Sequence, residues 1–315
     1  MCLKAVEHVL TGNLFDSFGI PPAYRAWLKK SWEIDEHTIY GRFDLAYTPG
    51  GEPKLLEYNA DTPTALLEAA VIQWFWLKDT CRDADQFNSI HERLIEIWQI
   101  LKPRLAGTVY FSSLRGNVED YMTVNYVRDT AMQAGVRTEY LAVEDIAWNP
   151  ARRQFVAPGG TPIGSIFKLY PWEWMLREEF GSYLPVSPTR WFEPPWKMLL
   201  SNKAILPVLW QLFPESRYLL RAEPQPFGPS YVRKPLQGRE GANVTIVIDE
   251  QAVHETEGPY DGPCIYQQYC PLPRFDGNYA VLGSWIVNGY ACGMGVREDE
   301  HPVTRNTSRF VPHRL

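Results

Sequence analysis

One stretch, YGRFDLAYTPGGEPKLLEYNAD at residues 40–61, most narrowly limits how this chain can fold. Residues 40–47 and 54–59 alternate polar and apolar side chains around the turn signal TPGGEP, which predicts a β-hairpin. Side chains two apart on a strand share a face, so Arg42 points with Asp44, and Glu57 points with Asn59. The opposite face carries apolar residues that are predicted to meet the core: Phe43, Leu45, Leu56 and Tyr58.

If the two polar faces of this hairpin agree, one guanidinium, two carboxylates and one carboxamide converge. Hard oxygen ligands beside a fixed cation are what Mg²⁺ and phosphate groups require, so this face is a candidate Mg²⁺–phosphate site. The alternative is a solvated sheet face whose charges form cross-strand ion pairs. The hairpin alone does not decide between the two.

Composition bounds the class of protein. A chain of 315 residues can bury a large core and is expected to form two domains or subdomains. A net charge of −6 and a pI near 5.6 argue against a nucleic-acid partner held by phosphate contacts. The odd number of cysteines, five, and the absence of CxxC argue against a disulfide framework or a zinc site. With no signal peptide and no long apolar stretch, the sequence predicts a cytoplasmic protein without a membrane partner.

The chain divides into three parts by pattern. Residues 1–104 hold the hairpin among helices expected at 1–12, at 65–79 after a cap at Thr62 or Thr64, and at 83–101. The first of these helices lacks a residue that could cap it, which favours a truncated start or an internal methionine at Met1. Residues 105–171 alternate strand, helix and strand, which predicts a small parallel α/β unit.

In residues 172–315, a helix is expected over 191–213, broken near Pro207. The rest of this part is rich in strands, among them two that meet at a hairpin turn, Asn288-Gly289.

Two lysines in this third part are candidates for binding phosphate. Lys234 lies near the end of a strand and is followed by a loop with Gly238 and Gly241, where backbone N–H groups can approach phosphate oxygens. The loop is not a Walker motif, because neither GK[ST] nor a helix follows. An ordinary hairpin loop with an exposed lysine is the alternative. Lys203 is a lone cation in an apolar helical segment, and the alternative there is a surface lysine.

Other polar residues have a functional and a structural interpretation. Gln267 and Gln268 lie in an apolar strand that places one of them inward, either to contact an adenine edge or to make a structural hydrogen bond. Arg297 could clamp an anion or pair with its acidic neighbours at 298–300. Glu119 and Asp120 could hold a cationic amine or simply be solvated. The six histidines show neither metal spacing nor a triad pattern, which disfavours nucleophilic hydrolysis.

Six segments resemble the synthetase domain of the glutathionylspermidine synthase family, and most closely its single-domain acid–amine ligases: GRFD, LLEYNADTPT, SNKAILPVLW, YVRKPLQGREGANV, IYQQYCPLPRFDGNY and ACGMGVRED. The resemblance covers nearly the whole chain in the same order. It implies an α+β fold, an ATP-grasp, in which residues 1–104 and 172–315 form the ligase and nucleotide-binding parts. Residues 105–171 would form the small pre-ATP-grasp-like unit.

The resemblance also implies roles for individual residues. It implies that ATP and Mg²⁺ are the cofactors, with Asp44, Glu57 and Asn59 as the magnesium ligands and Arg42 as a catalytic contact to phosphate and substrate. The nucleotide contacts that it implies are Arg42, Lys203, Lys234, Gly238, Gly241, Gln267, Gln268, Tyr269 and Cys270. The substrate contacts are Thr62, Glu119, Asp120 and Arg297, of which Glu119 and Asp120 lie on the amine side.

The function expected from this resemblance is an ATP- and Mg²⁺-dependent ligase that joins a carboxylate to an amine through an acyl phosphate. Its partners would be a peptide-like acid and a polyamine-type amine. Two alternatives are a nucleotide-binding protein without ligase activity and an aromatic-rich carbohydrate binder, since the chain holds 12 tryptophans. The resemblance does not extend to the cysteine amidase domain of the bifunctional members. Thr62 and Thr64 stand where the family often has serines, which leaves the acid open.

Overall fold

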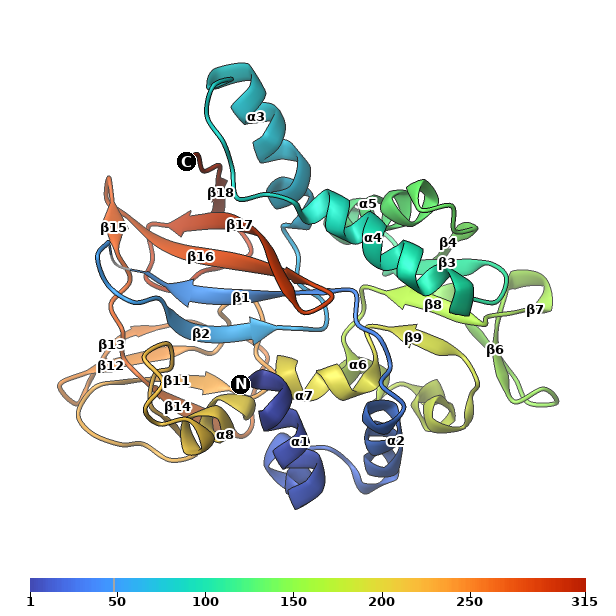
Figure 1. Cartoon of the computed structure of the whole chain (residues 1–315). Coiled ribbons are helices and arrows are strands. Elements are labelled where there is room, and N and C mark those ends of the chain that lie inside the picture. Colours follow the sequence, from blue (N-terminus) through green and yellow to red (C-terminus); the bar gives the residue numbers. More distant parts are fainter. Residues whose placement is uncertain (48) are drawn as a thin grey trace.

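The central sheet of the protein joins strands from both ends of the chain. The computed structural model describes residues 1–47 and 49–315, and the expected turn residue Thr48 lies outside them. The sheet has the order β18-β17-β16-β1-β2, with β15 also paired to β16 (Figure 1). Its strands are β1 (Tyr40–Ala46), β2 (Lys54–Asn59), β15 (Arg274–Phe275), β16 (Asn278–Val287), β17 (Tyr290–Asp299) and β18 (Arg309–Val311). The predicted hairpin of β1 and β2 is confirmed.

A second hairpin in this sheet, β16–β17, turns at Asn288 and Gly289. Both residues have positive φ, 48° and 81°, which is the backbone that a two-residue type I′ turn requires. The predicted turn is confirmed.

A second antiparallel sheet lies below the hairpin in Figure 1, with the order β10-β14-β11-β12-β13. Its strands are β10 (Ala222–Glu223), β11 (Tyr231–Pro235), β12 (Thr245–Ile248), β13 (Gln251–Glu255) and β14 (Cys264–Gln268). The strands expected on either side of the glycine-containing loop are β11 and β12, which pair antiparallel. The loop itself therefore projects from one end of this sheet.

The expected parallel α/β unit is present and larger than predicted. Its sheet has the order β4-β3-β8-β9, all parallel: β3 (Val109–Ser113), β4 (Thr138–Ala142), β8 (Ser165–Lys168) and β9 (Arg190–Phe192). Helix α5 (Val118–Gln133) connects β3 to β4 and ends before Gly135 at φ 76°. A three-stranded sheet follows β4: β5 (Ala147–Asn149), β6 (Gln154–Ala157) and β7 (Thr161–Pro162).

Strand β9 corrects one prediction. Residues 191 and 192 were expected to begin a helix, but with Arg190 they add a fourth strand to the parallel sheet. Two of them, Trp191 and Phe192, are buried, and aromatic side chains suit a pleated, buried surface.

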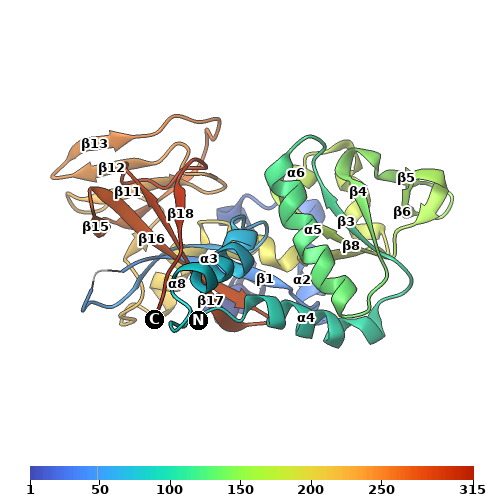
Figure 2. The ribbon, with the colours of Figure 1, turned by 90° about the horizontal axis from the view of Figure 1, so that it is seen from above.

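The helices pack around and between these sheets, with α6 and α7 near the middle of the molecule (Figures 1 and 2). They are α1 (Cys2–Gly12), α2 (Pro22–Glu33), α3 (Gln73–Thr80), α4 (Ile90–Leu101), α6 (Trp172–Met175), α7 (Met198–Ser201) and α8 (Ile205–Leu212). Shorter helical turns, the second of them a π-helix and the others 3₁₀-helices, span Leu14–Phe18, Glu68–Ile72, Lys102–Arg104, Val143–Asp145, Pro158–Gly160, Glu179–Val186 and Pro195–Lys197. None of the helices in the described residues is long and apolar enough to cross a bilayer.

Three predicted helix boundaries are wrong. The helix after the hairpin begins at residue 66, behind Ala65 at φ 62°, and not at a threonine cap. Helix α4 begins at Ile90, not at residue 83. The expected break near Pro207 lies at 202–204 instead, between α7 and α8. Pro207 falls in the first turn of α8, where its missing N–H has no intrahelical partner to lose.

Tryptophans fill the interior between these layers. Five of them are buried: Trp98, Trp172, Trp191, Trp196 and Trp285. Large aromatics bury much apolar area, so a core role accounts for these residues. The hairpin of β1 and β2 forms the edge of the central sheet nearest the second antiparallel sheet, and the parallel sheet lies to its right in Figure 1.

Candidate functional site

The β1–β2 hairpin has the register that its alternation predicted. Arg42 lies opposite Asn59, and Asp44 lies opposite Glu57, so the four polar side chains share one face. A β-bulge follows, because Leu45 pairs with Leu55 and leaves Leu56 as the extra residue.

The bulge changes which leucine is buried. Leu55 belongs to the core, whereas Leu56 lines a cavity, contrary to prediction. The other residues expected on the apolar face, Phe43, Leu45 and Tyr58, pack against the core as predicted.

A cavity of about 700 Å³ lies over the polar face of the hairpin. This volume is in the range of small-molecule sites. Most residues singled out in the sequence line it: Arg42, Asp44, Glu57, Asn59, Thr62, Glu119, Asp120, Lys203, Lys234, Gly238, Gly241, Tyr269, Cys270 and Arg297. Gln267 and Gln268 are not among its lining residues. Segments that are far apart in the sequence therefore meet at one place.

Two arginines share the carboxylate of Asp44. Arg42 donates to it from Nε at 2.6 Å and from Nη2 at 3.0 Å, and Arg297 donates from Nη2 at 2.6 Å. Burial alone would raise the pKa of this carboxyl, but Arg297 and Arg42 outweigh it and lower the pKa to about 2. Asp44 is therefore ionised at neutral pH.

Arg297 does not pair with the acidic residues that follow it. Asp299 pairs with Arg305, and Glu298 lies 3.6 Å from Arg309. Arg297 instead reaches across the sheet from β17 to β1, where Asp44 holds it in the cavity.

The two lysines approach the same hairpin from the other side. Lys203 lies in the turn between α7 and α8, with its Nζ 3.0 Å from Glu57 Oε2 and 2.7 Å from the carbonyl oxygen of Gly238. Lys234 donates to Gln267 Oε1 at 2.7 Å and to the carbonyl oxygen of Leu56 at 3.0 Å. The bulged leucine thus supplies an acceptor for a cavity lysine.

Lys234 has neutral acceptors only, and its environment disfavours the charge. Burial lowers its pKa to about 8; Lys203 acts in the same direction, while Glu57 opposes it. Gln267 is buried and also donates to the carbonyl oxygen of Leu55 at 2.9 Å. Its amide therefore positions Lys234, and Gln268 points to solvent, so the predicted alternation of this strand is confirmed.

The glycine-containing loop between β11 and β12 packs closely against the C-terminal segment. A Cβ on Gly241, whose φ is +70°, would lie 2.4 Å from the carbonyl oxygen of Thr304, so only glycine fits there. Between the two glycines, Arg239 donates to Glu173 Oε1 from Nε at 2.9 Å and from Nη2 at 2.6 Å, and to Thr62 Oγ1 at 2.7 Å. These contacts fasten the loop across the cavity.

Acidic side chains gather at the start of α5. Glu119 and Asp120 lie in its first turn, where Asn117 Oδ1 accepts from the backbone N–H of Asp120 at 3.1 Å. Burial, Glu119 and Glu240 raise the pKa of Asp120 to about 6, and Arg239 opposes them. This end of the cavity therefore favours a cation, whereas the hairpin end is rich in cations.

Comparison with known proteins identifies the family. The model of the glutathionylspermidine synthase preATP-grasp family matches residues 1–315. The chain belongs to this family. It is 43% identical to a "putative acid–amine ligase" of Haemophilus influenzae, over 99% of this chain and 84% of that protein. It is 29% identical to the bifunctional glutathionylspermidine synthetase/amidase of Escherichia coli, over 99% of this chain and 55% of that protein.

One further relative is longer than this chain, and one solved structure shares its fold. Trypanothione synthetase of Crithidia fasciculata is 29% identical over 95% of this chain and 50% of its own length, so the chain spans about half of these longer relatives. A solved structure of a "putative gamma-glutamylcysteine synthetase" from Methylobacillus flagellatus is similar in fold, with a TM-score of 0.57 and 9% identity. It covers 99% of this chain and 86% of that one, which supports the mixed α+β fold.

In this member of the glutathionylspermidine synthase family, the side-chain oxygens on the polar face of the hairpin are suited to binding a hard cation. Asp44 and Glu57 face each other across the strands, and Asn59 lies two residues from Glu57 on the same face. The described residues hold no group of three or more His, Cys, Asp or Glu arranged around one point. The hairpin offers only two carboxylates, and its third donor is an amide.

Two residues that line the cavity were not assigned from the sequence. Arg239 stands between Gly238 and Gly241, and this position in the loop was the one available signal. Glu173, its partner, lies in α6, and nothing in the run PWEWM indicates that its carboxylate faces the cavity.

Proposed function

We propose that this protein is an ATP- and Mg²⁺-dependent ligase that joins a carboxylate to an amine through an acyl phosphate. The relatives are ligases and synthetases, so the chain is an enzyme of the carboxylate–amine ligase kind. The observation that carries the proposal is one cavity in which cations face the carboxylates of Asp44 and Glu57. A negatively charged polyphosphate and a divalent cation would together balance this arrangement.

The hairpin would hold the metal, and the lysines would hold the phosphates. Asp44, Glu57 and Asn59 would be the ligands of Mg²⁺, which when bound would neutralise phosphate charge. Lys203, from the turn between α7 and α8, and Lys234, from β11, approach the hairpin and would contact the phosphates. Tyr269 and Cys270 line the cavity just past the end of β14 and would lie beside the base. A nucleotide held in this way between the two antiparallel sheets would have the ATP-grasp arrangement.

Two bond exchanges would complete the reaction. A carboxylate oxygen of the acid attacks the γ-phosphorus of ATP, forming the acyl phosphate as the bond to ADP breaks. The amine, neutral at its nucleophilic nitrogen, then attacks the acyl carbon, forming the amide as phosphate leaves and the nitrogen loses a proton. Arg42 would stabilise the charge that develops on the transferring group. Other parts of the enzyme would position the reactants and exclude water.

The polarity of the cavity suggests where each substrate lies. Arg297 would bind the acid, because its guanidinium can hold a carboxylate bidentately. Glu119 and Asp120 would bind the cationic part of the amine, and Thr62 would contact the acid near the hairpin. The names of the longer relatives suggest a peptide-like acid and a polyamine-type amine.

A screen for ADP release tests this function. Purified protein is given Mg²⁺-ATP with pairs of peptide-like acids and polyamines, and with each member of a pair alone. ADP should be released only when both members are present, and the amide should be detected by mass spectrometry. Tight ATP binding without ADP release from any pair would favour the nucleotide-binding protein without ligase activity.

The metal assignment has its own test. Calorimetry should show that ATP binds more weakly when Mg²⁺ is chelated. Glu57→Ala removes a charged ligand and should weaken Mg²⁺-dependent binding by roughly 10- to 150-fold, the effect of about 1.5–3 kcal/mol. Asn59→Ala removes a neutral ligand and should weaken it less. Equal ATP affinity with and without chelator would contradict the assignment.

A further inference from the structure

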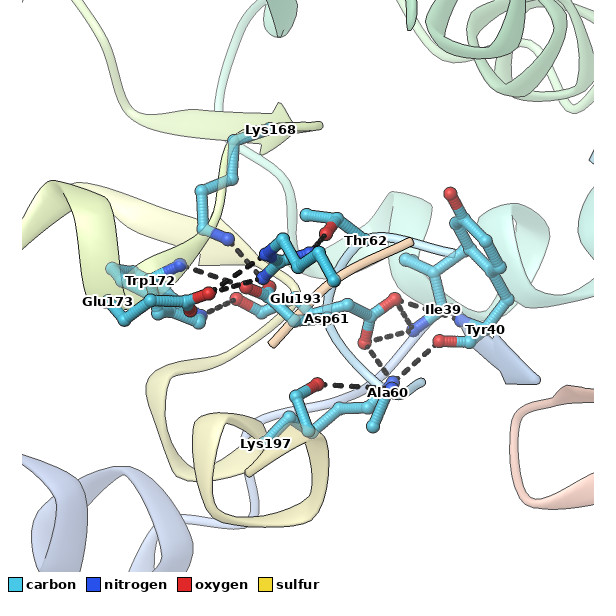
Figure 3. Close-up of polar contacts among 12 residues, drawn as sticks. Ile39, Tyr40, Ala60, Asp61, Thr62, Lys168, Trp172, Glu173, Glu193 and Lys197 are labelled. Carbon is cyan, nitrogen blue, oxygen red and sulfur yellow. Dashed lines mark hydrogen bonds and ion pairs between the residues drawn. The ribbon is translucent and has the colours of Figure 1, made fainter. Parts of the chain in front are cut away.

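A fully buried ion pair lies directly behind the cavity. Lys168, the last residue of β8, places its Nζ 2.7 Å from Oδ1 of Asp61, two residues after β2 ends (Figure 3). Both side chains are 1% exposed. The other oxygen of Asp61 accepts from the backbone N–H of Trp172, the first residue of α6, at 2.9 Å. Asp61 ends the hairpin stretch 40–61, but neither the sequence analysis nor the proposed chemistry assigns it or Lys168 a role.

The pair belongs to a closed ring of contacts that includes the glycine-containing loop. Thr62 follows Asp61 in the chain, and Glu173 follows Trp172. Arg239 bridges Thr62 and Glu173 with three hydrogen bonds of 2.6–2.9 Å. Asp61 bridges the same two segments from behind, so the spacing of the two acceptors of Arg239 is set by the position of Asp61 (Figure 3).

Trp172 is fixed at three points. Besides the bond from its backbone to Asp61, its indole N–H donates to the carbonyl oxygen of Glu193 at 3.2 Å. The Nζ of Lys168 lies 4.2 Å from the centroid of its ring, within cation–π distance. A residue held in this way cannot shift without breaking a buried polar contact, each of which is costly to leave unmade.

We propose that Asp61 and Lys168 are positioning residues that hold the docking platform of Arg239, formed by Thr62 and Glu173, and so keep the Gly238–Gly241 loop fastened over the cavity. A well-packed apolar pair could replace a buried ion pair without loss of stability. An apolar pair cannot reproduce the directed hydrogen bonds of Asp61. These bonds join three segments: the one that follows β2, strand β8 and helix α6. The inference concerns loop docking and holds whatever reaction the cavity performs.

Limited proteolysis with trypsin tests the proposal without a known substrate. Trypsin cleaves after arginine, and cleavage at Arg239 gives fragments 1–239 and 240–315, which mass spectrometry identifies. When a loop opens and closes faster than it is cut, the cleavage rate follows the population of the open form. Lys168→Met should therefore accelerate cleavage at Arg239 about tenfold or more. A factor of ten corresponds to about 1.4 kcal/mol of docking free energy.

Further variants separate docking from general loss of stability. Glu173→Gln weakens the platform directly and should accelerate the same cleavage. Because Lys168→Met leaves a buried carboxylate unpaired, it could fail to fold. The double variant Asp61→Asn/Lys168→Met removes both charges, keeps an acceptor for Trp172, and should still be cleaved faster than the wild type.

Gln73→Leu is the matched control. Gln73 is fully buried; its Nε2 donates to the carbonyl oxygens of Ala69 and Met294, and its Oε1 bonds to His313, all outside the ring. It should lower global stability without selective cleavage at Arg239. The proposal is overturned if the folded Asp61/Lys168 variants are cleaved at Arg239 at the wild-type rate, or if Gln73→Leu accelerates that cleavage equally.

Discussion

Two groups of charged residues lie side by side in this protein and differ in what balances them. In the core group, Lys168 pairs with Asp61 and Lys197 pairs with Glu193, both at 2.7 Å. In the cavity group, two arginines share the one carboxylate of Asp44, and Lys234 has only neutral acceptors. The core group is complete without a ligand, whereas the cavity group would be balanced by added negative charge.

The difference separates stability from binding. Removing a partner from the core group leaves a buried charge uncompensated, so the cost falls on folding. Removing Lys234, which has neutral acceptors, or Arg297, which shares Asp44 with Arg42, leaves no buried carboxylate unpaired, so the cost is expected to fall on the ligand. The predictions below test this separation.

Lys197→Met should have the largest effect, and on stability alone. Burial raises the pKa of Glu193 and lowers that of Lys197, and each side chain counteracts the shift of the other. Loss of the lysine should lower the free energy of unfolding by about 3–5 kcal/mol in denaturant titrations. ATP affinity by calorimetry on the folded variant should stay at the wild-type value.

A double variant controls this result. Glu193→Gln/Lys197→Met keeps an acceptor for the backbone N–H groups of Ile39 and Tyr40, to which Glu193 is bonded at 2.9–3.1 Å. It should recover much of the lost stability. Lowered ATP affinity in the folded single variant would contradict the claim that the core group acts on stability and not on ligand binding.

Lys234→Met should show the opposite pattern. Its charge should matter most when charge develops on the transferring phosphoryl group, so kcat should fall by roughly 10²- to 10³-fold. The variant should stay folded, because Lys234 is held by neutral acceptors and its burial already disfavours the charge. Lys78→Met, on α3 and outside the cavity, is the control and should leave kcat unchanged. A folded Lys234→Met enzyme with wild-type kcat would remove this lysine from the mechanism.

Arg297→Ala should affect the acid substrate and not ATP. Truncation removes a charge-assisted contact of about 1.5–3 kcal/mol, so kcat/KM for the acid should fall roughly 10- to 150-fold. Arg42 still binds Asp44 in this variant, so ATP affinity should barely change. The control Arg309→Ala removes an exposed arginine near Glu298 and should change kcat/KM by a small factor at most. A defect confined to ATP would reassign Arg297 to the nucleotide.

The smallest effect should be a pH dependence of ATP binding. The pKa of Lys234 is lowered to about 8, so the ligand-free protein loses this proton as the pH rises through 8. Bound phosphates would favour the charged form and raise the pKa, so ATP binding near pH 8–9 should take up protons and weaken with rising pH. Calorimetry in buffers of different ionisation enthalpy measures the uptake. The same proton uptake in Lys234→Met would assign it to another group.

The sequence predicted those parts of the site that depend on local periodicity. The alternation of residues 40–59 placed Arg42, Asp44, Glu57 and Asn59 on one face, and the register confirms it. Alternation cannot reveal a bulge, so the sequence predicted Leu56 in the core, where the structure has Leu55.

Contacts between distant segments had no local signal. The partners Asp61 and Lys168 are separated by most of the parallel unit, and Arg297 meets Asp44 only because β16 brings β17 alongside β1. The pair Glu193–Lys197 has helical i,i+4 spacing and could have been noticed, but its burial could not. Strand β9 was read as a helix because a short aromatic run has no distinguishing period.

The order of strands in the central sheet has a consequence for how the protein is made. Strand β1 emerges early from the ribosome, but β16, its neighbour in the sheet, is synthesised only near the end of the chain. Until then the β1 edge of the hairpin that carries Asp44 and Glu57 is unpaired, and such edges can pair with other chains. Nascent chains that stall before β16 are therefore expected to need a chaperone or to aggregate, and chains released after β17 are expected to stay soluble.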